Sequence, residues 1–428
     1  MKILLTLAVT LGMTGGAYAA DFNGLSGLTA PKVKAAIPAD GITITPARVF
    51  RSETSKAGPE KVKFGFVSEA ERNEYIAKAQ LWAPEGSLNV AALDFKKGPF
   101  DPLKYVPEEL VTCKYIPTAV AYEGETPSGK TPKFKCEDPK GKKLKIKYGK
   151  DNGEVQCEVA ATWIMTAIGA GADRMYPITL TCPDCPSDPF VSEADPGAWV
   201  NGQKVATEDK LGERIEITAN SGVGFDEFYR IEDRVGAEAL AGLAQFLGNT
   251  DNKAANNAIS CEKKDVVADP ATGKAGCLKP IVHMQDVGIT FGGKALYHNK
   301  RMNFESWAKE KVWLDPAKCI MSLNEVGTGS LKGVDASGRN LHQIGEQARQ
   351  LLVRRMSMLS RAQLADIFTA ARAPERAPMH SAEEWADLFI RKVNELRYPL
   401  GENAGNFSCL YDVVPPNSAQ APAAPAAR

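Results

Sequence analysis

The sequence lacks a surplus of charge of either sign: 52 lysines and arginines balance 52 aspartates and glutamates, and there are only 4 histidines. A neutral chain has no general field that attracts nucleic acid or anionic lipid, so we expect no nucleic-acid partner. The only C-x-x-C pair is Cys182 with Cys185. With so few histidines and no second such pair, we favour disulfide bonds over a zinc site.

Long apolar runs are also missing after the first residues, so the sequence predicts no membrane span. Several catalytic signatures are absent: G-x-S-x-G, H-E-x-x-H and the Walker A loop. A Ser-His hydrolase stays open, because the members of a triad need not be close in sequence. No internal repeat is visible.

The N-terminus carries an export signature. Lys2 precedes the uncharged stretch from Ile3 to Met13, and the small-residue triplet Ala17-Tyr18-Ala19 follows. This order predicts a signal peptide over residues 1–19 and a periplasmic or secreted protein; the alternative is an amphipathic or buried N-terminal helix. In an oxidising compartment the 9 cysteines should form disulfides, and an odd number leaves at least one thiol free or paired outside the chain.

Composition divides the remainder into four segments. Residues 20–60 are rich in Pro, Gly and Ala and should be extended, whereas the Pro/Ala tail over 413–428 should be disordered. Residues 61–190 indicate short strands with one helix, and 191–412 are mostly helical. The order predicts an α+β fold with two lobes, a small strand-rich N-lobe and a larger helical C-lobe.

A hairpin and several helices can be placed. The segments KTPKFKC and KKLKIKYG flank the turn EDPKGK, with Leu144, Ile146 and Tyr148 on one face of the second strand. A helix with an apolar stripe should follow over 153–169, then a strand, MYPITLTC. Another helix is expected over about 236–247. Capping boxes predict two further helix starts, at Ser360 with Gln363 and at Ser381 with Glu384.

The segment FLGNTDNKAANN contains Asp251, Lys253 and Asn256 in the pattern D-x-K-x-x-N. In phosphoryl transfer, an Asp in the catalytic loop accepts the proton of the acceptor hydroxyl, and an Asn five residues later holds Mg²⁺. The residues at these positions are therefore candidates for those roles, with Lys253 steadying the transferred phosphoryl group. A polar loop that ends a helix would explain the same residues.

Thirty residues downstream, an apolar strand in KPIVHMQDVGITFGG leads to Asp286 and Gly288. A carboxylate after a buried strand can bind metal, and the glycine gives the chain room to turn. An ordinary strand-to-turn Asp-Gly is the alternative. The neighbouring His283 we interpret as a core residue.

Upstream, Lys147 closes the second hairpin strand, and Glu158 lies eleven residues later on the expected helix. Kinases use a strand lysine to bind the α- and β-phosphates and a helix carboxylate to orient that lysine. Lys145 and Glu154 fit by spacing as well, because Glu154 and Glu158 lie one turn apart. An exposed lysine and a solvated glutamate are the alternative.

Together these segments (KIKYG, EVQCEVAATWIMTAIG, FLGNTDNKAANN and QDVGITFG, in this order) resemble the protein-kinase-like fold. The layout is similar to that of the Golgi casein kinases of the secretory pathway and the serine-kinase toxins of bacterial persistence. The chain also resembles a group of uncharacterised bacterial exported proteins. The resemblance covers roughly residues 130–295 and implies an ATP site held by Lys147 and Glu158, Mg²⁺ on Asp286 and Asn256, and Asp251 as the catalytic base.

Departures from the family pattern concern the phosphate-binding loop and the metal loop. No Gly-rich G-x-G-x-x-G turn precedes Lys147, and the turn EDPKGK is the only candidate cover for phosphates. The gap from Asn256 to Asp286 is long and contains Cys261 and Cys277, which we expect to form a disulfide.

The sequence predicts an exported kinase-like phosphotransferase that uses Mg-ATP on an unknown protein, sugar or other hydroxyl acceptor. The alternative is an inactive kinase-like scaffold that binds a ligand or an envelope partner, which the scarcity of ATP outside the cytoplasm favours. A third interpretation is an unrelated disulfide-bonded protein with these motifs by chance.

Overall fold

The computed structural model describes residues 64–122, 131–149, 152–190, 192–196, 203–217, 222–269, 273–293, 301–323, 330–331, 333–402 and 407–409. The chain divides into two compact units, Met1–Gly58 and Pro59–Arg428, and all described residues belong to the second. The predicted signal peptide, the segment over 20–60 and the Pro/Ala tail over 413–428 lie outside the described residues.

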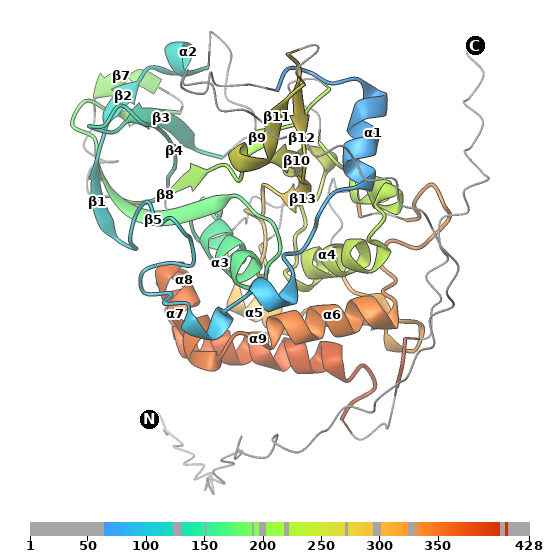
Figure 1. The fold of residues 1–428 in the computed structure, drawn as a ribbon. Coiled ribbons are helices and arrows are strands. Elements are labelled where there is room, and N and C mark those ends of the chain that lie inside the picture. The colour runs from blue at the N-terminus through green and yellow to red at the C-terminus, as the bar shows by residue number, and fades with distance from the viewer. Residues whose placement is uncertain are drawn as a thin grey trace, which may run out of the picture. The chain divides into compact units, whose positions relative to one another are not determined.

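The fold is α+β, with a six-stranded sheet in the order β1-β5-β8-β4-β3-β2 among the described residues (Figure 1). β1 runs parallel to β5, and the other neighbours are antiparallel. The strands are β1 (Glu109–Thr112), β2 (Lys114–Ile116), β3 (Lys133–Glu137), β4 (Lys143–Lys147), β5 (Arg174–Thr181) and β8 (Gln203–Asp209). The sheet therefore extends past residue 190, where the sequence places the end of the strand-rich region.

The β3–β4 hairpin forms as predicted, and Leu144, Ile146 and Tyr148 are buried. Its register pairs Lys133 with Lys147 at one end and Glu137 with Lys143 at the other. The turn EDPKGK closes the second end, about 13 Å along the strand from Lys147 at ~3.3 Å per residue. The expectation that this turn covers phosphates bound at Lys147 is therefore wrong.

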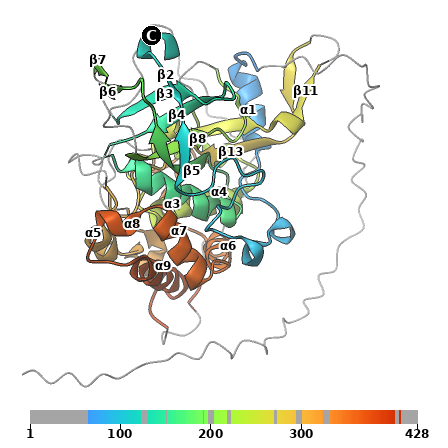
Figure 2. The same ribbon diagram turned by 90° about the vertical axis from the view of Figure 1, so that its left-hand side faces the viewer.

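Helix α3 (Glu154–Ala167) lies between the sheet and the C-terminal helices, packed against β5 on one side and α7 (Arg361–Ala370) on the other (Figures 1 and 2). Every residue of α3 except Thr166 is buried. The sequence predicts one apolar stripe, but a helix enclosed on opposite sides is buried around its whole circumference.

A second, three-stranded sheet has the order β13-β10-β9. Its strands are β9 (Glu213–Arg214), β10 (Asn257–Cys261) and β13 (Pro280–Met284). Between β10 and β13 the chain makes a short hairpin of β11 (Val266–Ala268) and β12 (Ala275–Cys277). The disulfide Cys261–Cys277 closes the base of this hairpin, which confirms the predicted pairing.

Although the region over 191–412 that the sequence predicts as mostly helical also contains β8, β9, β10 and β13, the C-terminal part of the described chain carries most of the helices. Its elements are α4 (Arg234–Phe246), α5 (Phe304–Lys309), β14 (Trp313–Asp315), β15 (Ile320–Met321), α6 (Glu346–Met356), α7, α8 (Ala373–Arg376) and α9 (Ala382–Arg397). The side chains of Ser360 and Ser381 cap α7 and α9 in complete capping boxes, which confirms both predicted helix starts. No helix in the described ranges combines the length and the apolar character needed to cross a membrane.

Three further elements complete the described fold. Helix α1 (Glu69–Ala77) packs near β13 of the three-stranded sheet, whereas α2 (Thr118–Ala121) contacts β3 of the six-stranded sheet. The third is the hairpin of β6 (Pro186–Asp188) with β7 (Ser192–Pro196). Helix α1 was not predicted, although Ser68 and Glu71 form a capping box at its start. Four disulfides join eight cysteines, namely Cys113–Cys136, Cys182–Cys185, Cys261–Cys277 and Cys319–Cys409, and Cys157 is buried outside these disulfides. This pattern is typical of an oxidising environment.

Candidate active site

The centre of the candidate site is the ammonium of Lys147, the last residue of β4. Its Nζ lies 2.5 Å from Oε1 of Glu158 and 3.0 Å from Oε2 of Glu154. Because α3 begins seven residues after the strand ends, its first two turns lie beside the end of β4. The structure thus brings together the predicted pair Lys147–Glu158 and adds Glu154 as a second partner.

Lys145, considered by spacing as an alternative to Lys147, has a different partner. Its Nζ lies 2.5 Å from Oε2 of Glu208 on the neighbouring strand β8, and the same carboxylate atom is 4.0 Å from Lys147. Lys147 is only 3% exposed, whereas the side chain of Lys145 is 34% exposed. Lys147 is therefore the buried cation of the site, and Lys145 lies at its edge.

The buried charges include a surplus of carboxylate. Burial alone would lower the pKa of Lys147, but Glu154, Glu158, Asp286 and Glu208 hold it well above its usual value. Burial raises the pKa of Glu158 well above the ordinary range, and the charges of Asp286 and Glu154 raise it further. Lys147 acts in the opposite direction and lowers this pKa. Since like charges raise carboxyl pKa values, Asp286 belongs to the same electrostatic cluster as Lys147 and Glu158.

Asp286 is positioned by the loop that follows β13. The backbone N–H of Gly288 donates to Oδ1 of Asp286 over 3.2 Å. A Cβ atom at position 288 would lie 2.2 Å from Cγ of Glu154, so no residue other than glycine fits against α3 here. The predicted D-x-G loop therefore packs directly on the helix that carries Glu154 and Glu158.

Asp251 and its neighbours form the loop between α4 and β10. Nζ of Lys253 lies 2.9 Å from Oδ2 of Asp251, and Nδ2 of Asn256 donates to the backbone oxygen of Asp251 over 2.5 Å. The side chain of Asn252, buried in the middle of the loop, accepts from the N–H of Leu331 at 2.9 Å. These bonds fix the positions of Asp251, Lys253 and Asn256 relative to one another.

Two adjacent strands bring this loop to the D-x-G loop. β10 and β13 are antiparallel with Asn257 opposite Met284, so the segment before β10 and the segment after β13 lie at the same end. The backbone oxygen of Asn256 accepts from the N–H groups of Gln285 at 2.9 Å and Asp286 at 3.1 Å. Further along, the N–H of Thr250 donates to the oxygen of Ile289 at 3.2 Å. The two loops thus run side by side.

The two residues predicted to hold a divalent cation, Asp286 and Asn256, provide one carboxylate and one amide. Within the described ranges, no three His, Cys, Asp or Glu side chains are grouped as ligands of a metal ion. Mg²⁺, however, usually keeps several waters and takes one or two protein carboxylates beside substrate phosphates. Oε2 of Glu158 is buried and accepts no hydrogen bond from the described residues. The surplus of buried carboxylate is therefore compatible with a cation.

His283, considered in the sequence as a core residue, belongs to a separate buried cluster. Its Nε2 lies 3.1 Å from Nη1 of Arg214 and 3.4 Å from Oδ1 of Asp173, and the ring is 0% exposed. Arg214 also donates to both carboxylate oxygens of Asp173, at 2.9 and 2.6 Å. This cluster joins the start of β5 to β9 and β13, and its role is structural.

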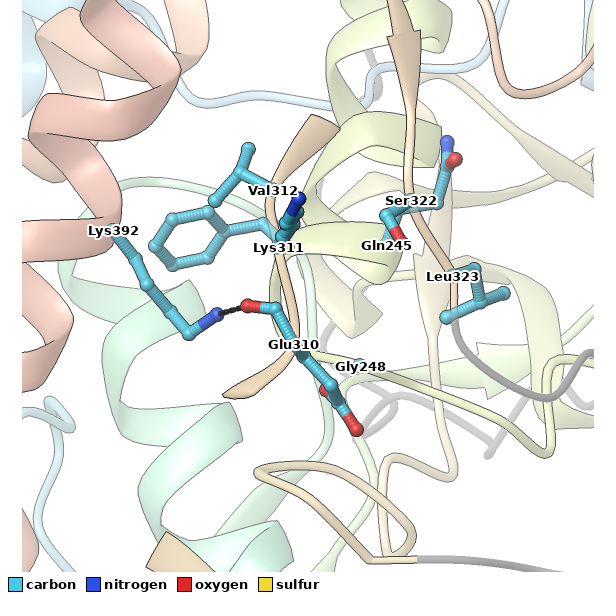
Figure 3. A pocket seen from close by; sticks show the side chains of 9 residues that line it. Gln245, Gly248, Glu310, Lys311, Val312, Ser322, Leu323 and Lys392 are labelled. Carbon is cyan, nitrogen blue, oxygen red and sulfur yellow. Dashed lines mark hydrogen bonds between the residues drawn. The ribbon is translucent and has the colours of Figure 1, made fainter. Parts of the chain in front are cut away.

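In the helical part of the described chain, two of the cavities are lined without any predicted site residue. The one in Figure 3 lies beside the end of α4, where the ammonium of Lys392 donates to the backbone oxygen of Glu310. Its volume of about 10 Å³ is at the lower limit for one water molecule. The other, about 370 Å³, lies between the start of α6 and the end of α9.

Sequence reasoning missed three side chains of the site: Glu208, Lys133 and Thr131. Glu208 lies on β8, in a part of the chain whose pairing no local pattern reveals. Thr131 donates to Oε1 of Glu154 over 2.5 Å, just before β3 begins. Lys133 is opposite Lys147 in the hairpin register, which a hairpin drawn from the sequence could have shown.

Comparison with known proteins finds no protein-family model that matches the chain and no curated protein that matches it. Among solved structures, the crystal structure of a Helicobacter pylori proinflammatory kinase, CtkA, is similar over 68% of this chain and 95% of that chain. The TM-score is 0.37 and the sequence identity is 11%. A likeness this distant carries no argument about function, which leaves the geometry of the site as the basis for one.

Proposed function

We propose that this chain is an exported kinase-like phosphotransferase that transfers a phosphoryl group from Mg-ATP to a hydroxyl acceptor on a protein or a sugar. The observation that carries the proposal is the buried ion pair between Lys147 and Glu158, with Asp286 in the same electrostatic cluster. The loop of Asp251 is bonded to the backbone of Asp286 through Asn256. This arrangement supports one site built from three distant segments.

The proposal includes a two-lobed layout. The strand-rich lobe comprises the six-stranded sheet and α3 and ends after β8, at Asp209 rather than at residue 190. The lobe that follows contains the loops of Asp251 and Asp286 and the C-terminal helices. In this layout the nucleotide binds where the end of β4 and the two loops meet.

In the proposed reaction, Lys147 binds the α- and β-phosphates, and Glu158 orients its ammonium. Asp286 and Asn256 would hold Mg²⁺, which supplies charge neutralisation on the β- and γ-phosphate oxygens. The carboxylate of Asp251 accepts the proton of the acceptor hydroxyl. The acceptor oxygen then forms a bond to the γ-phosphorus, while the bond to the β-phosphate oxygen breaks and its electron pair leaves with ADP. Lys253 steadies the transferred group.

A catalytically inactive scaffold is the second candidate, and two contacts favour it. Lys147 is enclosed by Glu154 as well as Glu158, so phosphates have to compete with two carboxylates. Lys253 contacts Asp251 itself, with distances of 2.9 and 3.2 Å to its two carboxylate oxygens. A chain that keeps these contacts would bind a ligand or a partner without transferring phosphate.

Thermal melting with and without millimolar Mg-ATP tests the nucleotide site. Ligand at 100 times its Kd stabilises the folded state by about 2.7 kcal/mol, which raises Tm by a few degrees. We expect this rise for the wild type and for Asp269→Ala, an exposed aspartate of the β11–β12 hairpin, and its loss for Asp286→Ala. A wild-type Tm unchanged by Mg-ATP would contradict the phosphotransferase and leave the scaffold, whose ligand need not be a nucleotide.

Transfer of label from γ-labelled ATP then separates the two candidates. Label incorporated into the chain or an added acceptor, and lost in Asp251→Asn, supports the phosphotransferase, because loss of the base should lower the rate by orders of magnitude. A thermal shift without any transfer would favour the scaffold.

A further inference from the structure

Lys133, the first residue of β3, lies directly opposite Lys147 of β4 in the antiparallel register. Residues opposite each other in an antiparallel pair point to the same face of the sheet, with their Cβ atoms about 5 Å apart. Lys133 therefore projects toward the side of the sheet on which Lys147 contacts Glu154 and Glu158. The hairpin delivers two ammoniums to the candidate site.

The electrostatic surroundings of Lys133 agree with this placement. Burial lowers its pKa below the usual value for lysine, while Glu154 and Asp286 act in the opposite direction. Lys145 and Lys147 add to the lowering. The charges that act on Lys133 are therefore those of the candidate site itself, including the proposed metal ligand.

Among the described residues, Lys133 has no carboxylate or carbonyl partner, unlike the other partly or fully buried lysines of strands β3 and β4. Lys147 has Glu154 and Glu158, Lys145 has Glu208, and Lys135 donates to the backbone oxygen of Ala121. A half-buried ammonium without a partner costs free energy, because it loses part of its hydration and gains no protein hydrogen bond in exchange. Such a group is poised to receive an anion.

The position of Lys133 suits a group that binds phosphates in place of a Gly-rich loop. The chain has no G-x-G-x-x-G turn before Lys147, and the turn EDPKGK lies at the far end of the hairpin. The end at which Lys147 lies is the end at which β3 begins. A cation at this end can bind phosphate oxygens that the backbone of a Gly-rich loop contacts in standard kinases.

We propose that Lys133 is a second phosphate-binding cation of this site, and that it and Lys147 together bind the polyphosphate chain of the nucleotide. The inference rests on the proposed function and deepens it. It assigns recognition of the phosphates to two lysines on adjacent strands. Affinity should then increase with the number of phosphates, because a ligand without a phosphate chain makes no contact with Lys133.

The test measures binding of Mg-ATP, Mg-ADP, adenosine and inorganic tripolyphosphate to the wild type, Lys133→Met, Lys133→Arg and Lys143→Met by titration calorimetry. Lys143 is the matched control, because it is an exposed lysine at the other end of the same hairpin. We expect Lys133→Met to weaken binding of Mg-ATP by about 10- to 100-fold, the range for one charge-assisted hydrogen bond. Lys133→Arg should recover most of the affinity because it keeps the charge.

Binding of adenosine should be the same in all four proteins, and Lys143→Met should bind every ligand like the wild type. Unchanged affinity of Lys133→Met for Mg-ATP, or an equal loss of affinity for adenosine, overturns the inference. Tripolyphosphate separates the role of Lys133 from the proposed function. A wild type that binds tripolyphosphate but no nucleotide refutes the kinase proposal. In that case, the loss of affinity for tripolyphosphate in Lys133→Met still decides whether Lys133 binds phosphate. A wild type that binds neither refutes both.

Discussion

At the scale of single residues, Lys147 compensates most of the buried negative charge near α3. Its removal leaves Glu154 and Glu158 without their common partner. We expect Lys147→Met to lower the free energy of unfolding by about 3–5 kcal/mol, because an unpaired buried charge is costly. Lys143→Met, exposed on the same strand, should change it by less than about 0.5 kcal/mol. Urea denaturation at pH 8 measures both, and equal stabilities would contradict the prediction.

The second prediction at this scale concerns pH and the cluster of Asp173, Arg214 and His283. Burial lowers the pKa of His283, and Arg214 lowers it further. The unfolded chain therefore takes up a proton on this histidine near pH 6.5, where the folded chain does not, so stability falls as pH drops below about 6.5. Although burial tends to raise the pKa of Asp173, Arg214 and His283 hold it far below 3.8. Protonation of Asp173 at more acidic pH therefore lowers the stability of the folded state further.

We accordingly expect Tm to decrease between pH 7 and pH 5, and this decrease to be smaller in His283→Asn. Calorimetric melting across this range gives the slope for both proteins. A Tm that does not change with pH, or an identical slope in the variant, would refute the role assigned to His283.

At the scale of elements, the contact between α3 and the D-x-G loop sets the geometry of the site. Gly288→Ala places a methyl group where Glu154 already lies, so we expect a loss of about 1–3 kcal/mol in stability and a weaker Mg-ATP shift. Gly276→Ala in β12 is the control, since its Cβ atom would make an ordinary contact at 3.6 Å. The prediction fails if both variants unfold at the same urea concentration.

Local sequence signals predicted several elements correctly. The strand alternation placed Lys147 at the end of β4, whereas its pairing with Glu158 was expected from the resemblance to the kinase-like fold. Capping boxes located the starts of α7 and α9. These features depend on residues a few positions apart, for which local rules are informative.

What the sequence could not show depends on long-range pairing. β8 enters the sheet between β4 and β5, which brings Glu208 to Lys145, and no local pattern specifies that neighbour. The apolar stripe expected for α3 gave no sign that α7 covers its other side. α1 was missed because few of its residues are apolar, and only Arg72 and Ile76 are buried.

At the scale of the whole molecule, the disulfides differ widely in the length of chain they enclose. Cys319–Cys409 spans 90 residues, whereas Cys182–Cys185 spans 3. In the chain-entropy account, the long loop stabilises the fold by about 4–5 kcal/mol and the short one by less than half as much. We expect Cys319→Ala/Cys409→Ala to unfold at a much lower urea concentration than Cys182→Ala/Cys185→Ala. Similar midpoints would argue against this account.

The burial of nearly all of α3 limits how far this helix can move. Fully burying side chains such as Val159, Trp163 and Ile164 is worth about 1.5–3 kcal/mol each. Swinging the helix outward would expose several of them at once, at a cost comparable to the whole stability of a domain. The contact of Lys147 with Glu158 is therefore set when the chain folds, and no partner has to complete it. For the proposed phosphotransferase, we therefore expect an activity that does not depend on a partner moving α3.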